Sequence, residues 1–148
     1  MKNILIICAV AFGFIACEKP AGEGGTSVIE GQVYKIHTSA DPFTGANTDT
    51  LYYQLDSGND VFIIYSSDES DVYDDKFETD WEGKYRFEYL RKGDYTIYTY
   101  ADSTVYLYPD DIDNSPKITY DYPIFRHITI SLNNSTNTLD NFIIEKNQ

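Results

Sequence analysis

Apolar and polar residues alternate in short runs from residue 28 onward, and clusters of Gly, Asp, Asn, Ser and Pro separate these runs. In residues 84–89 three aromatic side chains alternate with three charged ones, the period of two that a half-buried strand requires. Repeated short strands of this kind favour an all-β sandwich or barrel. The pattern predicts strands near residues 28–36, 51–55, 61–65, 72–79, 84–89, 95–101, 105–108, 123–132 and 139–146.

The same alternation assigns side chains to faces. In residues 84–89 the side chains expected to face the core are Tyr85, Phe87 and Tyr89. In residues 123–132 they are Ile124, Ile128, Ile130 and Leu132. Arg126 falls on this apolar face, so we expect it near a sheet edge or with its charged end reaching solvent. Residues 133–137 are all Asn, Ser or Thr and predict a hairpin loop.

The first sixteen residues join one positive charge, Lys2, to an apolar stretch that is too short to span a bilayer. Residues 1–16 therefore predict an export signal peptide that lies outside the fold. Residues 14–17 (Phe-Ile-Ala-Cys) resemble the lipobox of bacterial lipoproteins, which implies cleavage before Cys17 and diacylglycerol on its sulfur. The other cysteine, Cys8, lies within the apolar stretch, so the processed chain can form no internal disulfide.

Residues 17–27 are expected to hold the lipidated cysteine and a flexible tether rich in Gly and small polar residues. Residues 28–148 then form a single domain, large enough to bury a substantial core. Each buried CH₂ of an acyl chain contributes about 0.8 kcal/mol, so the chains of a lipoprotein make a stable anchor. We expect the protein in the cell envelope, anchored through Cys17 in the outer membrane.

A formal net charge of −13 limits the partners. Nucleic-acid binding rests on Lys and Arg that neutralise phosphates, which excludes this acidic chain from that class. Anionic headgroups would also repel it, so membrane attachment depends on the covalent lipid. The expected partners are the membrane and a protein or glycan.

Residues 79–98, TDWEGKYRFEYLRKGDYTIY, resemble the pattern T-x-x-x-G-x-Y-x-F-x-x-L-x-x-G-x-Y-x-I of carboxypeptidase regulatory-like and Cna-B-type domains. Residues 29–33 (IEGQV) resemble the first strand of the same group. These domains are transthyretin-like (prealbumin-like) sandwiches, so the resemblance implies a Greek-key β-sandwich. It also implies turns at Gly83 and Gly93, with core positions at Tyr85, Phe87, Leu90, Tyr95 and Ile97.

The Cna-B resemblance raises the question of an internal Lys–Asn isopeptide bond, with Lys35 and Asn141 as loosely placed candidates. The acid that promotes this bond in the family would fall at Thr99. Because a buried, uncharged lysine needs that carboxylate, we expect no isopeptide bond.

Nothing in the sequence converges on catalysis. There is no Gly-x-Ser-x-Gly elbow and no phosphate-binding Gly loop, and the thiol of Cys17 would be alkylated. The two histidines, His37 and His127, are interpreted as surface residues. We therefore expect a protein that is not an enzyme and needs no cofactor, although a site without a sequence signature stays open as an alternative.

Acidic clusters raise the possibility of calcium. The candidate ligands are Asp111 and Asp113, and a second acidic cluster spans residues 68–75. Calcium needs six to eight converging oxygens, and neither cluster has the Gly and distal Glu of an EF-hand. We interpret both clusters as solvated loops and expect no metal.

Tyrosine is unusually frequent, at 14 of 148 residues. Tyr98, Tyr100, Tyr106 and Tyr108 alternate with smaller residues, so they can form an exposed aromatic face on the side opposite the core. Such rings suit recognition of a partner or a sugar, although tyrosine also simply suits half-buried sheets. The leading hypothesis is a noncatalytic binding or scaffolding module. The alternative is a carbohydrate-binding accessory protein of a surface polysaccharide-uptake system.

Overall fold

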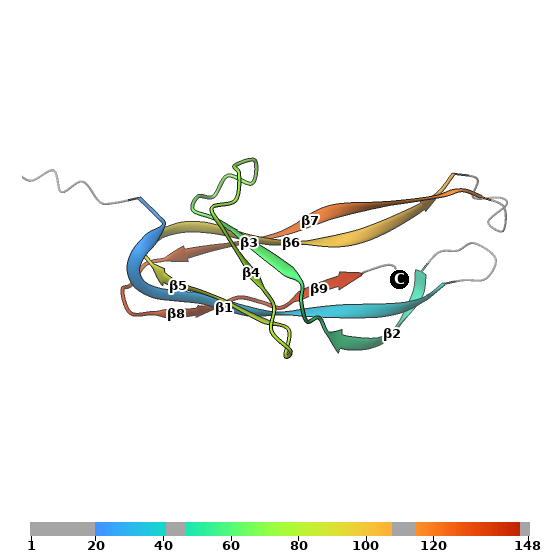
Figure 1. Cartoon of the computed structure of the whole chain (residues 1–148), viewed down its shortest axis with the longest axis horizontal. Coiled ribbons are helices and arrows are strands. Elements are labelled where there is room, and N and C mark those ends of the chain that lie inside the picture. The colour runs from blue at the N-terminus through green and yellow to red at the C-terminus, as the bar shows by residue number, and fades with distance from the viewer. Residues whose placement is uncertain (1–19, 41–46, 108–114, 146–148) are drawn as a thin grey trace, which may run out of the picture.

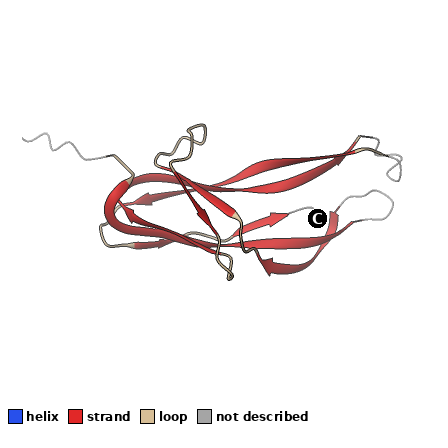
Figure 2. Ribbon diagram, viewed as in Figure 1, coloured by secondary structure: helices blue, strands red, loops and turns tan. Residues whose placement is uncertain are grey.

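The computed structural model describes residues 20–40, 47–107 and 115–145. All regular structure in these residues is β-strand (Figure 2). Hence no helix of the described residues is long and apolar enough to cross a membrane. The strands are β1 (Glu23–Ala40), β2 (Asn47–Leu55), β3 (Asp60–Ile64), β4 (Asp75–Glu78), β5 (Lys84–Leu90), β6 (Gly93–Tyr106), β7 (Lys117–Ile130), β8 (Thr136–Thr138) and β9 (Phe142–Glu145).

The strands form two facing sheets (Figure 1). In the first sheet, the antiparallel order is β2-β1-β5, and β8 and β9 both pair with β1 in parallel. The second sheet has the order β4-β3-β6-β7 and is antiparallel throughout. The expectation of an all-β sandwich is therefore confirmed.

The core lies between the two sheets and is built from the alternating side chains. Each strand of a sandwich turns every second residue inward, so the inner faces exclude water together. The motif of residues 79–98 supplies a large share of this core. Its fully or nearly fully buried members are Tyr85, Phe87, Leu90, Tyr95 and Ile97.

The strands predicted over 95–101 and 105–108 are parts of one strand, β6, and β7 begins at Lys117 rather than at residue 123. Together they form a long ribbon whose far end extends beyond β3 (Figure 1). There the polar segment 102–104 pairs normally instead of turning. Pro123 is accommodated because β7 is an edge strand.

Two side chains predicted to face the core are exposed. Tyr89 has a backbone φ of 59°, which breaks the alternation, and its ring is 69% exposed. Leu90 takes its place in the core. Leu132 follows the end of β7 and is also exposed.

The segment 133–137 is not a hairpin loop. The chain turns at Asn134, which has a φ of 53°, and leaves the second sheet. It then enters the first sheet as β8, parallel to residues 28–30 of β1. The polar side chains have a structural use here, since the Asn137 amide donates to the Val28 carbonyl oxygen at 3.0 Å.

The folded domain begins earlier than the sequence predicts. Residues 20–27 were expected to be part of a flexible tether, but β1 starts at Glu23 and pairs with β5. The amide of Gly22 donates to the Tyr95 hydroxyl at 2.9 Å, and Ser27 is fully buried. Residues 20–27 therefore belong to the folded domain, and the rest of the predicted tether, residues 17–19, lies outside the described residues.

Arg126 lies where its pattern predicts, on an edge strand. Its guanidinium is half-buried and stands 5.3 Å from the ring centroid of Phe142, in a cation–π geometry. The aromatic ring compensates the charge on the apolar face.

Candidate binding face

Five aromatic side chains gather on the outer face of the β4-β3-β6-β7 sheet. We call Phe62, Tyr73, Tyr98, Tyr100 and Phe125 the outer aromatic cluster. The strand register explains how most of them meet, because Phe62 pairs with Tyr98 and Tyr98 pairs with Phe125. Tyr73 comes instead from the segment between β3 and β4, residues 65–74, which we call the β3–β4 loop.

Phe62 is the centre of the outer aromatic cluster. Its ring stacks on Tyr98 with a centroid distance of 4.9 Å and an interplanar angle of 16°. Tyr73 is tilted against Phe62 at 4.9 Å, and Tyr100 meets it edge-on at 5.8 Å. Phe125 is tilted against Tyr98 at 5.2 Å. Offset and edge-to-face pairs of this kind stabilise each other beyond their buried area.

The cluster has a buried floor and two exposed rings. Tyr98 is only 8% exposed, whereas Tyr73 is 47% and Tyr100 is 40% exposed. Burial and the neighbouring Tyr100 hydroxyl raise the pKa of Tyr98 to about 12, so its hydroxyl stays protonated at neutral pH. The exposed part is therefore two tyrosine rings with polar tips, held at an angle above an apolar base.

Carboxylates border the cluster. Asp60, on the same strand as Phe62, forms an ion pair at 3.0 Å with Lys76, the residue of β4 that pairs with Phe62. Farther along the ribbon, Asp102 pairs in register with Asp121. The face therefore combines aromatic surface with negatively charged hydrogen-bond acceptors.

Carboxylates of the acidic cluster of residues 68–75 accept hydrogen bonds from groups in and next to their own loop. Asp68 accepts from the amide and hydroxyl of Ser70 at 2.9 and 2.7 Å, and Asp74 accepts from the Tyr65 amide at 2.6 Å. Within the described residues no group of three or more His, Cys, Asp or Glu side chains is placed to hold a metal ion. The other calcium candidates, Asp111 and Asp113, lie outside the described residues.

The structure assesses only part of the predicted tyrosine face. Tyr98 and Tyr100 lie together with ring centroids 5.7 Å apart and planes that cross at 84°. Tyr98 was expected to be exposed, but Phe62, Tyr100 and Phe125 pack around it and bury it. Tyr106 belongs to β6, but its side chain lies outside the described part, as does all of Tyr108 and the lipidation site Cys17. Sequence reasoning missed Phe62 and Phe125, which the strand register brings to Tyr98, and Tyr73, which comes from the β3–β4 loop. The outward position of Phe62 between Val61 and Ile63 was the available signal.

The two histidines lie on different sheets. His37 of β1 stacks on Tyr52 at 4.3 Å and contacts Gln54. His127 of β7 contacts Glu69 and Thr96 on the outer face of the second sheet. Two cavities are lined by described residues, with volumes of about 730 and 460 Å³, and neither has a histidine in its wall.

The isopeptide candidates are not paired. Lys35 is in register with Ile144, while Asn141 precedes β9 and lines the cavity of about 460 Å³.

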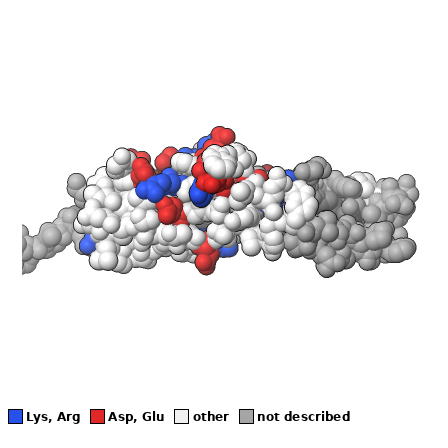
Figure 3. All heavy atoms as spheres, turned by 90° about the horizontal axis from the view of Figure 1, so that it is seen from below, with Lys and Arg blue, Asp and Glu red and all other residues white. Residues whose placement is uncertain are grey.

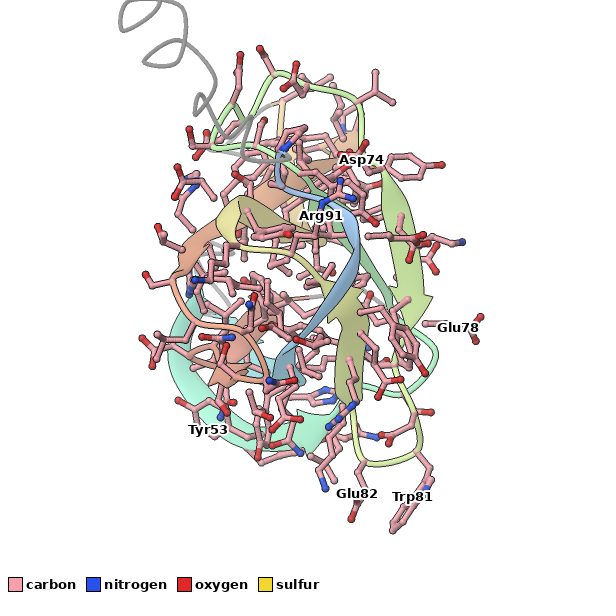
Figure 4. All side chains as sticks on the ribbon, turned by 90° about the vertical axis from the view of Figure 1, so that its left-hand side faces the viewer. Tyr53, Asp74, Glu78, Trp81, Glu82 and Arg91 are labelled. Carbon is pink, nitrogen blue, oxygen red and sulfur yellow. The ribbon has the colours of Figure 1, made fainter. Side chains whose placement is uncertain are left out.

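Other exposed features differ from the cluster. The outer face of the first sheet carries alternating charges, with Arg86 bonded to Glu30 at 2.8 Å and to Glu88 at 2.6 Å. Viewed from that side, basic and acidic side chains are intermixed (Figure 3). Trp81 and Glu82 project from the turn between β4 and β5 (Figure 4), and Trp81 is 78% exposed.

Comparisons with known proteins identify no family. No family model matches the chain, and no curated protein matches it. Among solved structures, one from Pseudomonas aeruginosa, a protein with a proposed carbohydrate-binding role, aligns with 85% of this chain and 92% of its own. The identity is 17% and the TM-score is 0.45, so the likeness carries no argument about function.

Proposed function

We propose that this chain is a noncatalytic binding module of the cell envelope, anchored by lipid on Cys17, and that it binds through the outer aromatic cluster. The observation that carries this proposal is the pair Tyr73 and Tyr100, two exposed rings. Both rings pack on Phe62, and Tyr100 also packs on the buried ring of Tyr98. Rigid, amphipathic rings of this kind give contact area at a low cost in conformational entropy.

The surroundings favour a ligand rich in hydroxyl groups and without negative charge. Sugar C–H groups can pack on the rings of Tyr73 and Tyr100, and sugar hydroxyls can donate to nearby carboxylates such as Asp60. An acidic polysaccharide would be repelled by a chain of net charge −13. Because the rings are not coplanar, the face suits a single sugar unit or a chain end better than a flat polymer surface.

The lipid anchor on Cys17 is part of this proposal and rests on the lipobox-like residues 14–17. Mass spectrometry of the chain isolated from cells should show loss of residues 1–16 and a gain in mass matching two or three acyl chains. An unmodified Cys17 thiol would remove the anchor and leave the binding face untouched.

We also propose that the sandwich is transthyretin-like. Support comes from the motif of residues 79–98, whose two glycines, Gly83 and Gly93, both have positive φ angles. The apolar positions that the resemblance places in the core are also buried. An experimental structure that includes the remaining loops, compared by strand order with that group, would test this assignment.

Binding is tested with the soluble fragment 18–148 on a glycan array, followed by calorimetry of the best ligand. The double variant Tyr73→Ala/Tyr100→Ala should weaken binding at least tenfold. Matched controls are Tyr53→Ala and Trp81→Ala, because both side chains are exposed away from the cluster. Binding that survives the double variant, or is lost in a control, would place the site elsewhere. If the wild type binds no glycan, the sugar ligand is excluded and a protein remains as the expected partner.

A further inference from the structure

His127 connects the second sheet to the loop that carries Tyr73. Its Nε2 lies 2.9 Å from Oε1 of Glu69, in the β3–β4 loop. Its Nδ1 lies 3.0 Å from Oγ1 of Thr96 on the neighbouring strand. Thr96 also touches the loop, because its hydroxyl donates to the Ser66 carbonyl oxygen at 2.8 Å.

The count of hydrogens at these atoms fixes the state of the ring. Thr96 has one hydroxyl hydrogen, and the carbonyl oxygen of Ser66 can only accept it. The hydroxyl oxygen of Thr96 must then accept from Nδ1 of His127. Glu69, as a carboxylate, can only accept from Nε2. The three contacts coexist only when both ring nitrogens carry hydrogen, that is, when His127 is an imidazolium.

A neutral imidazole loses one of these contacts. If Nδ1 lacks its hydrogen, Thr96 turns its hydroxyl toward the ring and the Ser66 carbonyl oxygen loses its donor. If Nε2 lacks its hydrogen, a lone pair faces the carboxylate of Glu69. Thr96 is fully buried, so its single hydroxyl hydrogen goes to one of these two protein acceptors rather than to water. In the neutral ring the half-buried Ser66 carbonyl oxygen then loses its bond to the sheet.

Other charges near His127 do not replace its role. On β6, Asp94 accepts from the Thr129 hydroxyl, and on β4 Lys76 is paired with Asp60. Arg126, the preceding residue, packs on Phe142 inside the sandwich. The loop itself adds only negative charge near the ring, from Asp68, Glu69, Asp71 and Asp74.

We propose that His127 is a proton-dependent positioning residue that, as an imidazolium, docks the β3–β4 loop on the sheet and so sets Tyr73 in the outer aromatic cluster. The use of this positioning, to complete the binding face, rests on the proposed function. The docking of the loop by His127 does not. The loop should therefore be docked when the ring is protonated and looser when the ring is neutral, since the neutral ring loses one of the three contacts.

The test measures the loop without any ligand. The chain as isolated from cells, in detergent, is examined by hydrogen exchange of residues 66–74 at pH 5.5 and pH 8, corrected for the intrinsic effect of pH. Exchange should be about three- to tenfold faster at pH 8, as expected for a half-exposed charged contact. In His127→Gln the difference between the two pH values should disappear.

The other histidine supplies the control, since His37→Gln should keep the full pH dependence. Nitrogen NMR of the His127 ring should show hydrogens on both nitrogens at pH 5.5. Loop protection that is independent of pH, or a neutral ring beneath a fully protected loop, would overturn the proposal. Because the readout needs no ligand, failure of the binding proposal would not affect this result.

Discussion

Tyr85 and Tyr95 are both fully buried, but their hydroxyl groups end in opposite environments. The Tyr95 hydroxyl accepts from the Gly22 amide and donates to the Arg91 carbonyl oxygen at 2.7 Å. The Tyr85 hydroxyl is buried without a hydrogen-bond partner. It lies over Gly31, where a Cβ atom would approach it to 2.4 Å, so only glycine fits at that position. The same side chain thus stabilises one site and carries a desolvation cost at the other.

Removal of the hydroxyl should therefore have opposite effects at these positions. Tyr85→Phe should raise the free energy of unfolding by about 1–2 kcal/mol, because an unpaired buried hydroxyl is removed. Tyr95→Phe should lower it by about 1–3 kcal/mol, because two backbone partners lose their bond. Urea unfolding with unchanged m-values measures both. A loss of stability in Tyr85→Phe would mean that its hydroxyl is satisfied.

Sequence reasoning located most core residues but not the arrangement of the binding face. Tyr85 and Phe87 were identified because period-two alternation determines their side, whereas Leu90 was implied only by the family resemblance of residues 79–98. Tyr89 was misassigned because it has a positive φ, and a tyrosine in the sequence gives no signal for that backbone conformation. Tyr73 was missed because the sequence predicts a strand over residues 72–79, whereas β4 begins at Asp75 and Tyr73 lies in the loop before it. The place of a loop side chain depends on contacts between residues far apart in sequence.

Among the elements, the turn between β4 and β5 depends most on a single residue. Gly83 has a φ of 69°, and its amide donates to the Asp80 carbonyl oxygen. Its carbonyl oxygen accepts from the amide of Val33 on the neighbouring strand. The turn therefore joins the hairpin to the first sheet.

Gly83→Ala should destabilise the domain more than Gly58→Ala, although both glycines have positive φ angles. A Cβ at Gly83 would lie 2.6 Å from the Val33 carbonyl oxygen, whereas at Gly58 the nearest atom is 3.6 Å away, at the end of the Glu78 side chain. We expect a cost of about 1 kcal/mol at Gly58 and clearly more at Gly83. Thermal unfolding compares the two variants. Equal losses of stability would show that the backbone at Val33 shifts easily to make room for the Cβ atom.

The strand ends were harder to predict than the strands. Beyond β3, the β6–β7 ribbon has few neighbours to bury either face, so its residues lack strict alternation and residues 102–104 look like a turn. At the other end, residues 23–27 look like a linker because Gly and Ser give no hydrophobic signal. Their backbone is nevertheless part of β1, paired with Leu90.

At the scale of the whole molecule, the early part of β1 closes one end of the sandwich. A fragment that begins at Val28 loses the Gly22–Tyr95 bond and the bond from Ser27 to the Leu132 carbonyl oxygen. It should unfold at a clearly lower urea concentration than the fragment 18–148, or fail to fold. Equal unfolding midpoints would show that residues 20–27 add no stability and belong with the tether, as the sequence predicts.

Alkaline pH should weaken the fold. Burial raises the pKa values of Tyr65 and Tyr85, and that of Tyr98 to about 12, whereas an unfolded tyrosine titrates near 10. A group whose pKa is higher when folded keeps its full contribution below pH 10 and loses it as the pH rises through 10 to 12. The urea midpoint of unfolding should fall as the pH is raised from 8 to 11, and this fall should be smaller in the Tyr98→Phe variant.

The early start of the fold also determines how the module stands on a bilayer. Cys17 and Pro20 are three residues apart, so a lipid on that sulfur would leave at most roughly 10 Å of chain before the ordered domain. The chain enters at one end of the long axis, and the two ribbons extend toward the other end (Figure 1). A lipidated protein would then stand close to the membrane with its long axis pointing away from the bilayer, instead of moving freely on a long linker. Its tyrosine-bearing side would look along the membrane plane and meet ligands that diffuse past it.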